Sequence, residues 1–270
     1  MCATCGCGDD GHDGPVITLP GQDHHHHPHR HDHPHDHDEH TETITLEQKV
    51  LAKNDLVADE NRRWLARRGI LALNVTSSPG AGKTTLLERT IREYGTRRPI
   101  AVIEGDQETL LDADRIRSAG ARSVQVNTGA GCHLDANMVR GALDALDPEP
   151  DSVLFIENVG NLVCPALFDL GERNKVVVVS VTEGADKPLK YPHMFAVADL
   201  VVINKIDLIP YVDFDVETCC SRARSVNPGV DILTVSAARG DGLEQWYSWI
   251  DTCAKTVMSA SAVDNMNSQE

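Results

Sequence analysis

The sequence predicts an α/β fold in which helices cover both faces of a mostly parallel sheet. The first observation is a series of short apolar runs that alternate with helical patterns, which is typical of strands buried on both faces of a parallel sheet. The second is the segment 70–94, where an apolar run, a glycine-bearing loop, Lys83-Thr84 and a helical run follow one another. That order is the phosphate-binding P-loop arrangement, so we expect the P-loop NTPase form of this fold.

The apolar runs place the elements of this sheet along the chain. The expected strands are 70–75, 99–103, 123–127, 153–156, 176–181, 200–203 and 232–235. The expected helices between the early strands are 84–94, 110–118 and 136–146. Ligands of such folds bind outside the carboxyl ends of the strands, and polar motifs follow most of these strands. We therefore expect one functional edge on a domain that spans 70–258.

Segments of different composition flank this domain. Residues 1–45 contain no Phe, Trp or Tyr, nine acids and one base, which gives −8 of the total net charge of −16. We expect this segment to be disordered. Capping-box spacing at Thr45 and the apolar pattern after it predict an N-terminal scaffold helix over 46–69. Residues 259–270 are predicted to form a flexible C-terminal tail.

Charge and cysteine usage exclude several function classes. The chain is acidic and has no basic stripe, which argues against nucleic acid and anionic membranes as partners. No apolar stretch reaches membrane-spanning length, and the N-terminus lacks a signal-peptide pattern. We therefore expect a cytoplasmic protein whose eight cysteines are thiols available to metals.

The predicted phosphate site is the loop Ser77-Ser78-Pro79-Gly80-Ala81-Gly82-Lys83-Thr84-Thr85. Gly80 and Gly82 let backbone N–H groups turn toward the phosphates, and the helix N-terminus adds its positive end. Lys83 supplies a charge to the β- and γ-phosphates, and the Thr84 hydroxyl is placed to bind Mg²⁺. Ser77 stands where the usual motif has its first glycine. The alternative is a chance turn before a helix.

The segment Asn204-Lys205-Ile206-Asp207 indicates which base the site selects. The Asp207 carboxylate can accept hydrogen bonds from N1–H and the 2-amino group of guanine, whereas adenine would leave this carboxylate unpaired and desolvated. Ser236-Ala237 after the last strand matches the loop that closes on the base. We therefore expect GTP and GDP as ligands and a GTPase domain over 70–258. Taken alone, Asn204 to Asp207 could be an ordinary strand-end turn.

Hydrolysis requires Mg²⁺ and a contact that senses the γ-phosphate. Asp106 ends the strand after the P-loop helix, where a carboxylate could bind Mg²⁺ directly or through water. Glu157-Asn158-Val159-Gly160 stands where GTPases carry D-x-x-G, and the Gly160 N–H could contact the γ-phosphate. No obvious glutamine follows to orient water, so we expect slow turnover. The expected catalytic set is Lys83, Thr84, Asp106, Glu157 and Gly160.

A candidate metal site follows two strand ends on the same edge. Cys132, His133 and Cys164 suit Zn²⁺ or Ni²⁺, and three ligands leave a fourth position that a second subunit could fill. Cys164 comes four residues after Gly160, so a γ-phosphate that repositions Gly160 would also move Cys164. Metal affinity would then differ between the GTP and GDP states, and metal would alter nucleotide affinity reciprocally. The alternative is that each residue is a small buried side chain.

The N-terminal segment contains two further candidate metal sites. Cys2, Cys5 and Cys7 could wrap three thiolates around one ion, with the terminal amine available as a fourth ligand. A redox pair, or thiols without a role, is the alternative. The tract from His24 to His40 holds ten histidines and suits weak binding of several Ni²⁺ ions. An affinity tag or a polar linker is the alternative, although Asp, Pro and Arg30 interrupt the run.

These motifs together closely resemble those of the hydrogenase nickel-incorporation GTPases, the HypB family of hydrogenase maturation factors. The resemblance covers nearly the whole chain and includes Ile103-Glu104-Gly105-Asp106-Gln107, Gly131-Cys132-His133-Leu134-Asp135 and the run from Glu157 to Pro165. It implies a GTP-dependent metallochaperone that dimerises across the nucleotide face and delivers Ni²⁺ to [NiFe]-hydrogenase. The implied partners are a small zinc-binding maturation protein and the precursor of the hydrogenase large subunit.

The resemblance also implies a role for each cysteine cluster. The N-terminal thiols would form a tight nickel site, and Cys132, His133 and Cys164 a Ni/Zn site at the dimer interface. Two alternatives stay open. The related urease-accessory GTPases also bind nickel, but they carry a Cys-Pro-His tripeptide that this chain lacks. A nickel-storage protein would hold many ions on its histidines, with the GTPase domain as a regulator.

Overall fold

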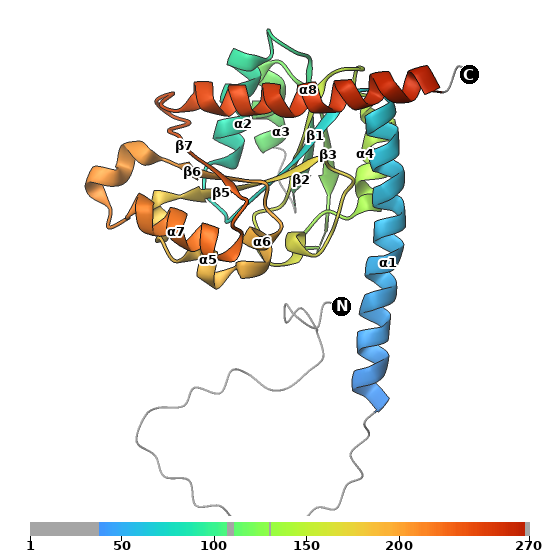
Figure 1. Cartoon of the computed structure of the whole chain (residues 1–270), viewed down its shortest axis with the longest axis horizontal. Coiled ribbons are helices and arrows are strands. Elements are labelled where there is room, and N and C mark those ends of the chain that lie inside the picture. Colours follow the sequence, from blue (N-terminus) through green and yellow to red (C-terminus); the bar gives the residue numbers. More distant parts are fainter. Residues whose placement is uncertain (1–37, 107–110, 130, 268–270) are drawn as a thin grey trace, which may run out of the picture. The chain divides into compact units, whose positions relative to one another are not determined.

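The computed structural model describes residues 38–106, 111–129 and 131–267 (Figure 1). The chain separates into two units, residues 1–50 and 51–270, and the second unit contains the whole sheet. Seven parallel strands lie in the order β3-β2-β4-β1-β5-β6-β7. Their bounds are β1 (Leu71–Ser77), β2 (Ile100–Asp106), β3 (Arg122–Asn127), β4 (Val153–Glu157), β5 (Asn174–Ser180), β6 (Leu200–Asn204) and β7 (Asp231–Thr234). The predicted fold class is confirmed.

Helix α1 precedes the first strand, α8 follows the last, and the other helices lie between strands. Their bounds are α1 (Asp38–Arg67), α2 (Lys83–Tyr94), α3 (Leu111–Ala119), α4 (Ala136–Leu146), α5 (Lys187–Lys190), α6 (Pro192–Ala196), α7 (Val216–Val226) and α8 (Leu243–Asn267). Three short 3-10 turns join them: η1 (Cys164–Ala166), η2 (Val181–Glu183) and η3 (Ile206–Tyr211). Each predicted helix from 84 to 146 appears with its ends shifted by no more than one residue.

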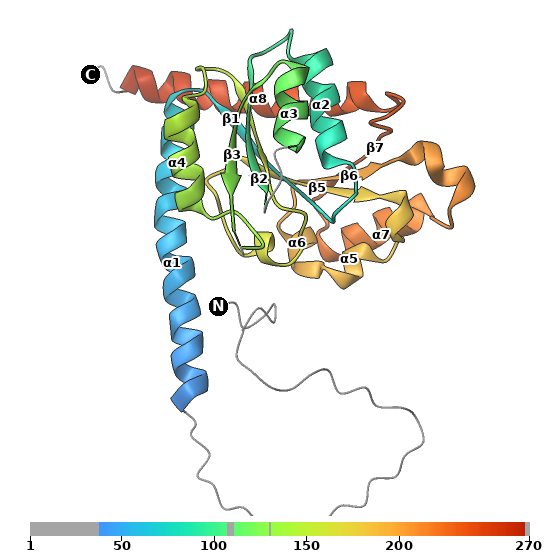
Figure 2. The ribbon, with the colours of Figure 1, turned by 180° about the vertical axis from the view of Figure 1, so that it is seen from behind.

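Apolar side chains hold a layer of helices on each face of the sheet (Figures 1 and 2). On one face, α2, α3 and α8 pack on the central strands, with Trp246 of α8 fully buried. On the other face, the end of α1 and α4 cover β2 and β4, while α6 and α7 cover β5 and β6. Because both faces are covered, the inner strands β1, β4, β5 and β6 are buried along nearly their whole length and are mostly apolar.

Two helices extend into segments that were expected to be disordered or flexible. The N-terminal helix was expected over 46–69, but α1 begins at Asp38, inside the segment expected to be disordered. The sequence from Asp38 to Arg67 has no Gly or Pro, and acids in a first turn favour a helix start. The expected flexible tail from 259 is likewise helical, because α8 continues to Asn267 and no Gly or Pro follows Gly242. Both differences arise because nothing in either sequence stops a helix.

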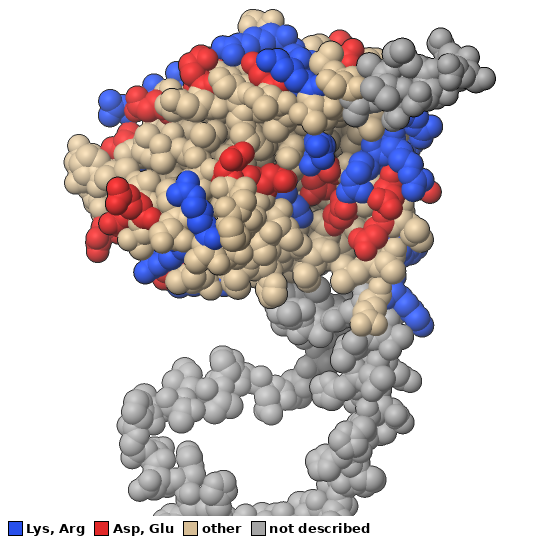
Figure 3. Space-filling view, in the orientation of Figure 1, with Lys and Arg blue, Asp and Glu red and all other residues tan. Residues whose placement is uncertain are grey.

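The described surface carries charged side chains of both signs (Figure 3). On the face drawn in Figure 3, basic and acidic side chains lie interspersed among the coloured residues. Within the described part of the chain, no helix combines the length and the apolarity needed to cross a bilayer.

Candidate nucleotide and metal sites

A cavity of about 550 Å³ opens at the carboxyl ends of β1, β2 and β4. Its lining consists of residues 77–85, 104–105 and 157–160, together with Arg115 and Lys205. The structure therefore brings together the P-loop, the end of β2, the Glu157 segment and part of the Asn204 segment. Parallel strands produce this convergence because their carboxyl ends share one edge.

Gly82 fixes the geometry of the P-loop. Its φ is 92°, which favours glycine, and a Cβ at this position would lie 2.5 Å from Nδ2 of Asn204. The Asn204 Nδ2 donates to the carbonyl of Ala81 at 2.9 Å, and the Lys205 Nζ donates to the carbonyl of Gly80 at 2.6 Å. Asn204 and Lys205 thus hold the phosphate loop through two of its backbone carbonyls. The sequence motif did not predict this contact.

Glu157 lines the cavity. Its Oε1 lies 2.8 Å from the Nζ of Lys83 and accepts a 2.7 Å hydrogen bond from the Thr84 hydroxyl. The side chain of Glu157 is 2% exposed, and among the described residues its Oε2 has no hydrogen-bond partner. A buried carboxylate oxygen beside a threonine hydroxyl is the hard oxygen environment that Mg²⁺ prefers.

Asp106 and Gly160 lie near the carboxyl ends of β2 and β4, at the edge of the sheet where the cavity opens. The β2 strand ends at Asp106, two residues beyond the pairing of Glu104 with Glu157, and the Asp106 side chain is outside the described part. A Cβ on Gly160 would lie 3.2 Å from atoms of Pro79, so this backbone passes directly against the P-loop. The segment that would sense a γ-phosphate is therefore in contact with the phosphate loop.

The residues expected to contact the base are organised by β6 and the loop after β7. Lys205 has a φ of 64°, which turns the chain so that Asp207 and Ser236 meet. The Ser236 hydroxyl donates to Oδ1 of Asp207 at 2.6 Å, and the Ala237 N–H donates to Oδ1 of Asn204 at 3.1 Å. The Ser236 hydroxyl thereby orients the Asp207 carboxylate.

Cys132, His133 and Cys164 form the group of potential metal ligands found in the described part of the chain. Their ligand atoms all lie within 4.8 Å of one another. The two sulfur atoms are 2.9 Å apart, beyond the roughly 2.05 Å of a disulfide, and the Cys132 sulfur is 3.6 Å from Nδ1 of His133. Two thiols and an imidazole at this spacing suit Zn²⁺ or Ni²⁺.

The surroundings of His133 favour the form that binds metal. Its ring stacks on Phe168, with ring centroids 4.0 Å apart. Burial lowers the pKa of His133, and the Asp135 charge opposes this only in part. The imidazole is therefore neutral at pH 7, as ligation requires. Cys164 is 2% exposed at the start of η1.

Comparison with known proteins assigns the chain to a family. Residues 71–234 match the family described as CobW/HypB/UreG, nucleotide-binding domain. The hydrogenase maturation factor HypB of Rhizobium leguminosarum bv. viciae is 60% identical over 211 residues, covering 78% of this chain and 71% of the relative. The chain belongs to the HypB family of hydrogenase maturation factors.

Two solved HypB structures share this architecture. HypB from Archaeoglobus fulgidus is 41% identical with a TM-score of 0.70, and the match covers 75% of this chain and 99% of that one. HypB from Helicobacter pylori, solved in complex with nickel, is 38% identical with a TM-score of 0.71, covering 76% and 96%. The family assignment favours hydrogenase maturation over the urease-accessory alternative.

Part of the predicted metal chemistry of this HypB-family chain lies outside the described residues. Cys2, Cys5 and Cys7 fall there, as do His24 to His37, and the side chain of His40 is not described although α1 includes its backbone. The tight thiol site and the weak histidine tract therefore stay predictions.

Two cations near the P-loop were not predicted from the sequence. Arg115 of α3 lines the cavity and donates to the Thr85 hydroxyl at 3.2 Å and to Glu88 at 2.9 Å. Lys187 of α5 donates to the Ser78 hydroxyl at 2.7 Å. Neither belongs to a phosphate-binding motif, so only the packing of their helices could reveal them.

Proposed function

We propose that this HypB-family chain is a GTP-hydrolysing nickel metallochaperone in which nucleotide state times the release of Ni²⁺ to a hydrogenase. The observation that carries the proposal is the Cys132, His133 and Cys164 cluster, which lies in loops that follow strands of the nucleotide edge. The nickel complex of the Helicobacter pylori relative supports nickel as the cargo.

The nucleotide step uses the residues of the cavity. Lys83 would bind the β- and γ-phosphates, and Asp207 would select guanine through two acceptor oxygens. Thr84, Asp106 and Glu157 would hold Mg²⁺, which supplies neutralisation of phosphate charge when bound. Lys83 and Thr84 both contact the Glu157 carboxylate, which would compete with phosphate and Mg²⁺ for them. Turnover is expected to be slow because no obvious glutamine follows Gly160 to orient water.

Exchange of partners at Glu157 provides a physical route to the metal site. When phosphate binds Lys83 and Mg²⁺ binds Thr84, Glu157 would lose both hydrogen bonds and the segment through Gly160 would be released to shift. Cys164 lies in the same loop, so the spacing of the metal ligands would differ between the GTP and GDP states. By linkage, bound metal then alters nucleotide affinity by the same factor.

The remaining elements of the proposal concern assembly. A homodimer formed across the nucleotide face would supply the fourth metal position and place two clusters together. The partners would be a small zinc-binding maturation protein and the hydrogenase large-subunit precursor, and Zn²⁺ fits the same ligands as Ni²⁺. The cytoplasmic setting, the dimer and these partners stay predictions.

The test uses the full chain with Cys2, Cys5 and Cys7 replaced by Ser, which we call the reporter chain. Thiolate-to-Ni²⁺ charge-transfer absorption then reports the Cys132–Cys164 cluster without interference from the histidine tract. We expect a Ni²⁺ affinity difference of at least tenfold between GDP and a non-hydrolysable GTP analogue, and its loss in Cys164→Ala. Equal affinities would overturn the nucleotide-timed release, and Lys83→Ala with unchanged GTP hydrolysis would overturn the GTPase assignment.

A nickel-storage function is the second candidate, and the ten histidines between His24 and His40 favour it. Storage requires many ions per chain, whereas delivery requires only the thiol sites and nucleotide switching. Deletion of residues 23–40 is expected to reduce the number of Ni²⁺ ions bound while hydrogenase maturation continues at ample nickel. A collapse of maturation under those conditions would assign the tract a role in delivery.

A further inference from the structure

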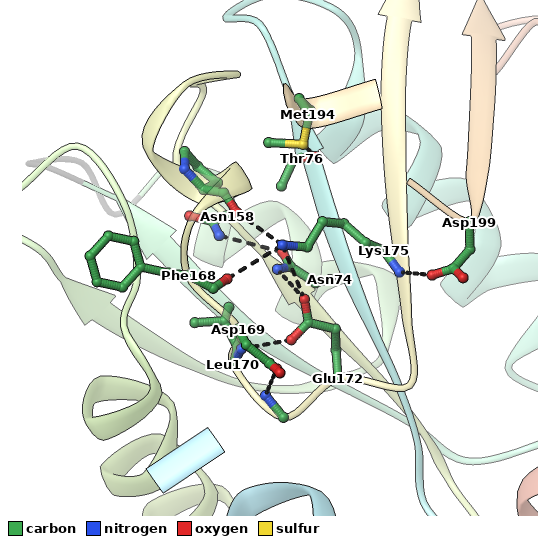
Figure 4. A network of polar contacts seen from close by, with 12 residues as sticks. Asn74, Thr76, Asn158, Phe168, Asp169, Leu170, Glu172, Lys175, Met194 and Asp199 are labelled. Carbon is green, nitrogen blue, oxygen red and sulfur yellow. Dashed lines mark hydrogen bonds and ion pairs between the residues drawn. The ribbon is translucent and has the colours of Figure 1, made fainter. Parts of the chain in front are cut away.

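Four buried polar side chains connect the nucleotide edge to the metal cluster. We call Asn74, Asn158, Glu172 and Lys175 the buried network. They lie between β1, β5 and the loop 165–172 (Figure 4), and Asn158 also lines the cavity. Asn74 and Asn158 are fully buried, while Lys175 is 7% and Glu172 9% exposed. Burial of so many polar groups is costly unless each is paired, so their hydrogen bonds define one specific arrangement.

One end of the buried network lies at Asn158, directly after Glu157. The Asn158 Oδ1 accepts hydrogen bonds from the N–H of Val159 at 3.0 Å and from the N–H of Leu134 at 3.2 Å. Leu134 follows His133, so this one amide oxygen binds both the segment 157–160, which is expected to contact the γ-phosphate, and the loop that contains Cys132 and His133. The Asn158 Nδ2 then donates to Oδ1 of Asn74 at 3.4 Å.

The other end of the buried network, at Lys175, binds the loop that follows Cys164. Asn74 Nδ2 donates to Oε1 of Glu172 at 2.9 Å, and the Nζ of Lys175 lies 3.5 Å from the same oxygen. Lys175 is opposite Asn74 in the pairing of β1 with β5. Its Nζ donates to the carbonyl of Pro165 at 2.9 Å and to the carbonyl of Phe168 at 3.3 Å.

These two carbonyls belong to the surroundings of the metal ligands. Pro165 follows Cys164, and the ring of Phe168 stacks on His133. Lys175 therefore positions the backbone beside one thiol and the side chain beside the imidazole. Glu172 is also held by the N–H of Leu170, at 2.7 Å from Oε2, so the whole loop 165–172 is bound to this ion pair.

We propose that the buried network is the positioning element through which Glu157 and the Cys132, His133 and Cys164 cluster influence each other. This inference rests on the proposed function. A shift of Asn158 either moves the network as a unit or leaves the Glu172 carboxylate and the Lys175 ammonium short of partners. A buried charge without a partner is strongly destabilising. We therefore expect the loop with Cys132 and His133 and the loop with Cys164 to move together.

The test compares two substitutions on one strand. Asn74→Leu breaks the middle of the buried network without touching a predicted nucleotide or metal ligand. Thr76→Val is the matched control, because Thr76 is equally buried on the same face of β1. Among the described residues, its hydroxyl binds only the Val176 carbonyl at 3.3 Å and the Met194 sulfur at 3.5 Å. Both are made in the reporter chain, and Ni²⁺ affinity is measured from the thiolate absorption with GDP and with the GTP analogue.

The ratio of the two Ni²⁺ affinities decides the inference. We expect Thr76→Val to keep the reporter chain's ratio of Ni²⁺ affinities between the GDP and GTP-analogue states. We expect Asn74→Leu to make the two affinities equal within a factor of two while the GTP analogue still binds. An Asn74→Leu chain that retains the full ratio would overturn the positioning role and leave the proposed function intact. A reporter chain whose own ratio is one would overturn the proposed nucleotide timing, and this inference with it.

A second variant keeps the test decisive if Asn74→Leu does not fold. Glu172→Gln preserves the size of the side chain but removes its charge and one acceptor oxygen. We expect it to reduce the ratio by at least threefold and to shift the charge-transfer band, because Lys175 loses its anionic partner beside the metal loop. Urea unfolding of each variant identifies chains that fail to fold, and a folded Glu172→Gln chain with the full ratio and an unchanged band would contradict the role of the ion pair.

Discussion

The Lys83 ammonium lies 2.8 Å from Oε1 of Glu157, and their side chains are only 12% and 2% exposed. The cation that is expected to bind phosphate is therefore paired with a buried carboxylate. A nucleotide must displace this ion pair, and its loss would leave a buried carboxylate that Mg²⁺ can pair. The pair thus links nucleotide affinity to Mg²⁺.

Glu157→Gln tests this competition. We expect the substitution to tighten GDP binding in EDTA by roughly tenfold, because Lys83 is released from a charged hydrogen bond worth about 1.5–3 kcal/mol. The additional affinity conferred by Mg²⁺ should fall, and GTP turnover should drop at least tenfold. Fluorescent-nucleotide titrations with and without Mg²⁺ measure both effects. The control is Glu149→Gln at an exposed position, and an unchanged Mg²⁺ effect in Glu157→Gln would contradict the assignment.

Asp207→Asn tests base selection. The variant should lose at least a hundredfold in GTP affinity, since two hydrogen bonds to a carboxylate are worth about 1.5–3 kcal/mol each. It should gain binding of xanthosine triphosphate, because the amide can donate to the 2-oxo group that replaces the 2-amino group. Competition titrations with the two nucleotides provide the measurement, with Asp213→Asn on the exposed loop as control. Retained preference for GTP would exclude Asp207 as the base contact.

Thiol reactivity should separate the metal cluster from the structural cysteines. Burial raises the pKa of Cys219 and of Cys253 to about 11, so about one thiol in a thousand is ionised at pH 8. We expect iodoacetamide at pH 8 to modify Cys132 at least tenfold faster than either. Peptide mass spectrometry follows each site, and Ni²⁺ should protect Cys132 but leave Cys219 and Cys253 unaffected. Equal protection at all three positions would contradict a site at Cys132.

The ion pair between Asp169 and Arg62 should make stability depend on pH. Burial raises the pKa of Asp169, but hydrogen bonds from the Gly171 N–H and from Arg62 outweigh it, so the net pKa is lowered. A lowered pKa stabilises the folded state above the ordinary value of about 3.9, and this contribution is lost as the pH falls through the folded value.

Asp169→Asn should therefore reduce the free energy of unfolding at pH 7 by about 0.5–1 kcal/mol, a small value because both side chains are 41% exposed. The difference from the unsubstituted chain should shrink below about pH 4. Urea unfolding at several pH values checks this. Asp59→Asn, which removes the other partner of Arg62 at a side chain that is 54% exposed, should have a smaller effect.

Local sequence was sufficient for the phosphate loop and the strand-end motifs. Gly82, Lys83 and Thr84 act through the backbone of one turn and the start of one helix, so their spacing alone predicts the structure. The strands were predicted because strands covered on both faces are rich in apolar residues. The start of α1 and the end of α8 were less predictable, because no Gly or Pro marks them.

Contacts between residues that are distant in the sequence could be identified only from the tertiary structure. Cys132 and Cys164 are 32 residues apart, and only the arrangement of the loops after β3 and β4 brings their sulfur atoms together. Lys175 lies at the start of an apolar strand and carries no motif; its role depends on β5 lying beside β1, where Asn74 faces it. The sequence alone determined which chemical groups stand at the strand ends. The order of the strands decided which buried polar groups meet, because a hydrogen bond depends on distances across the sheet that adjacent residues do not set.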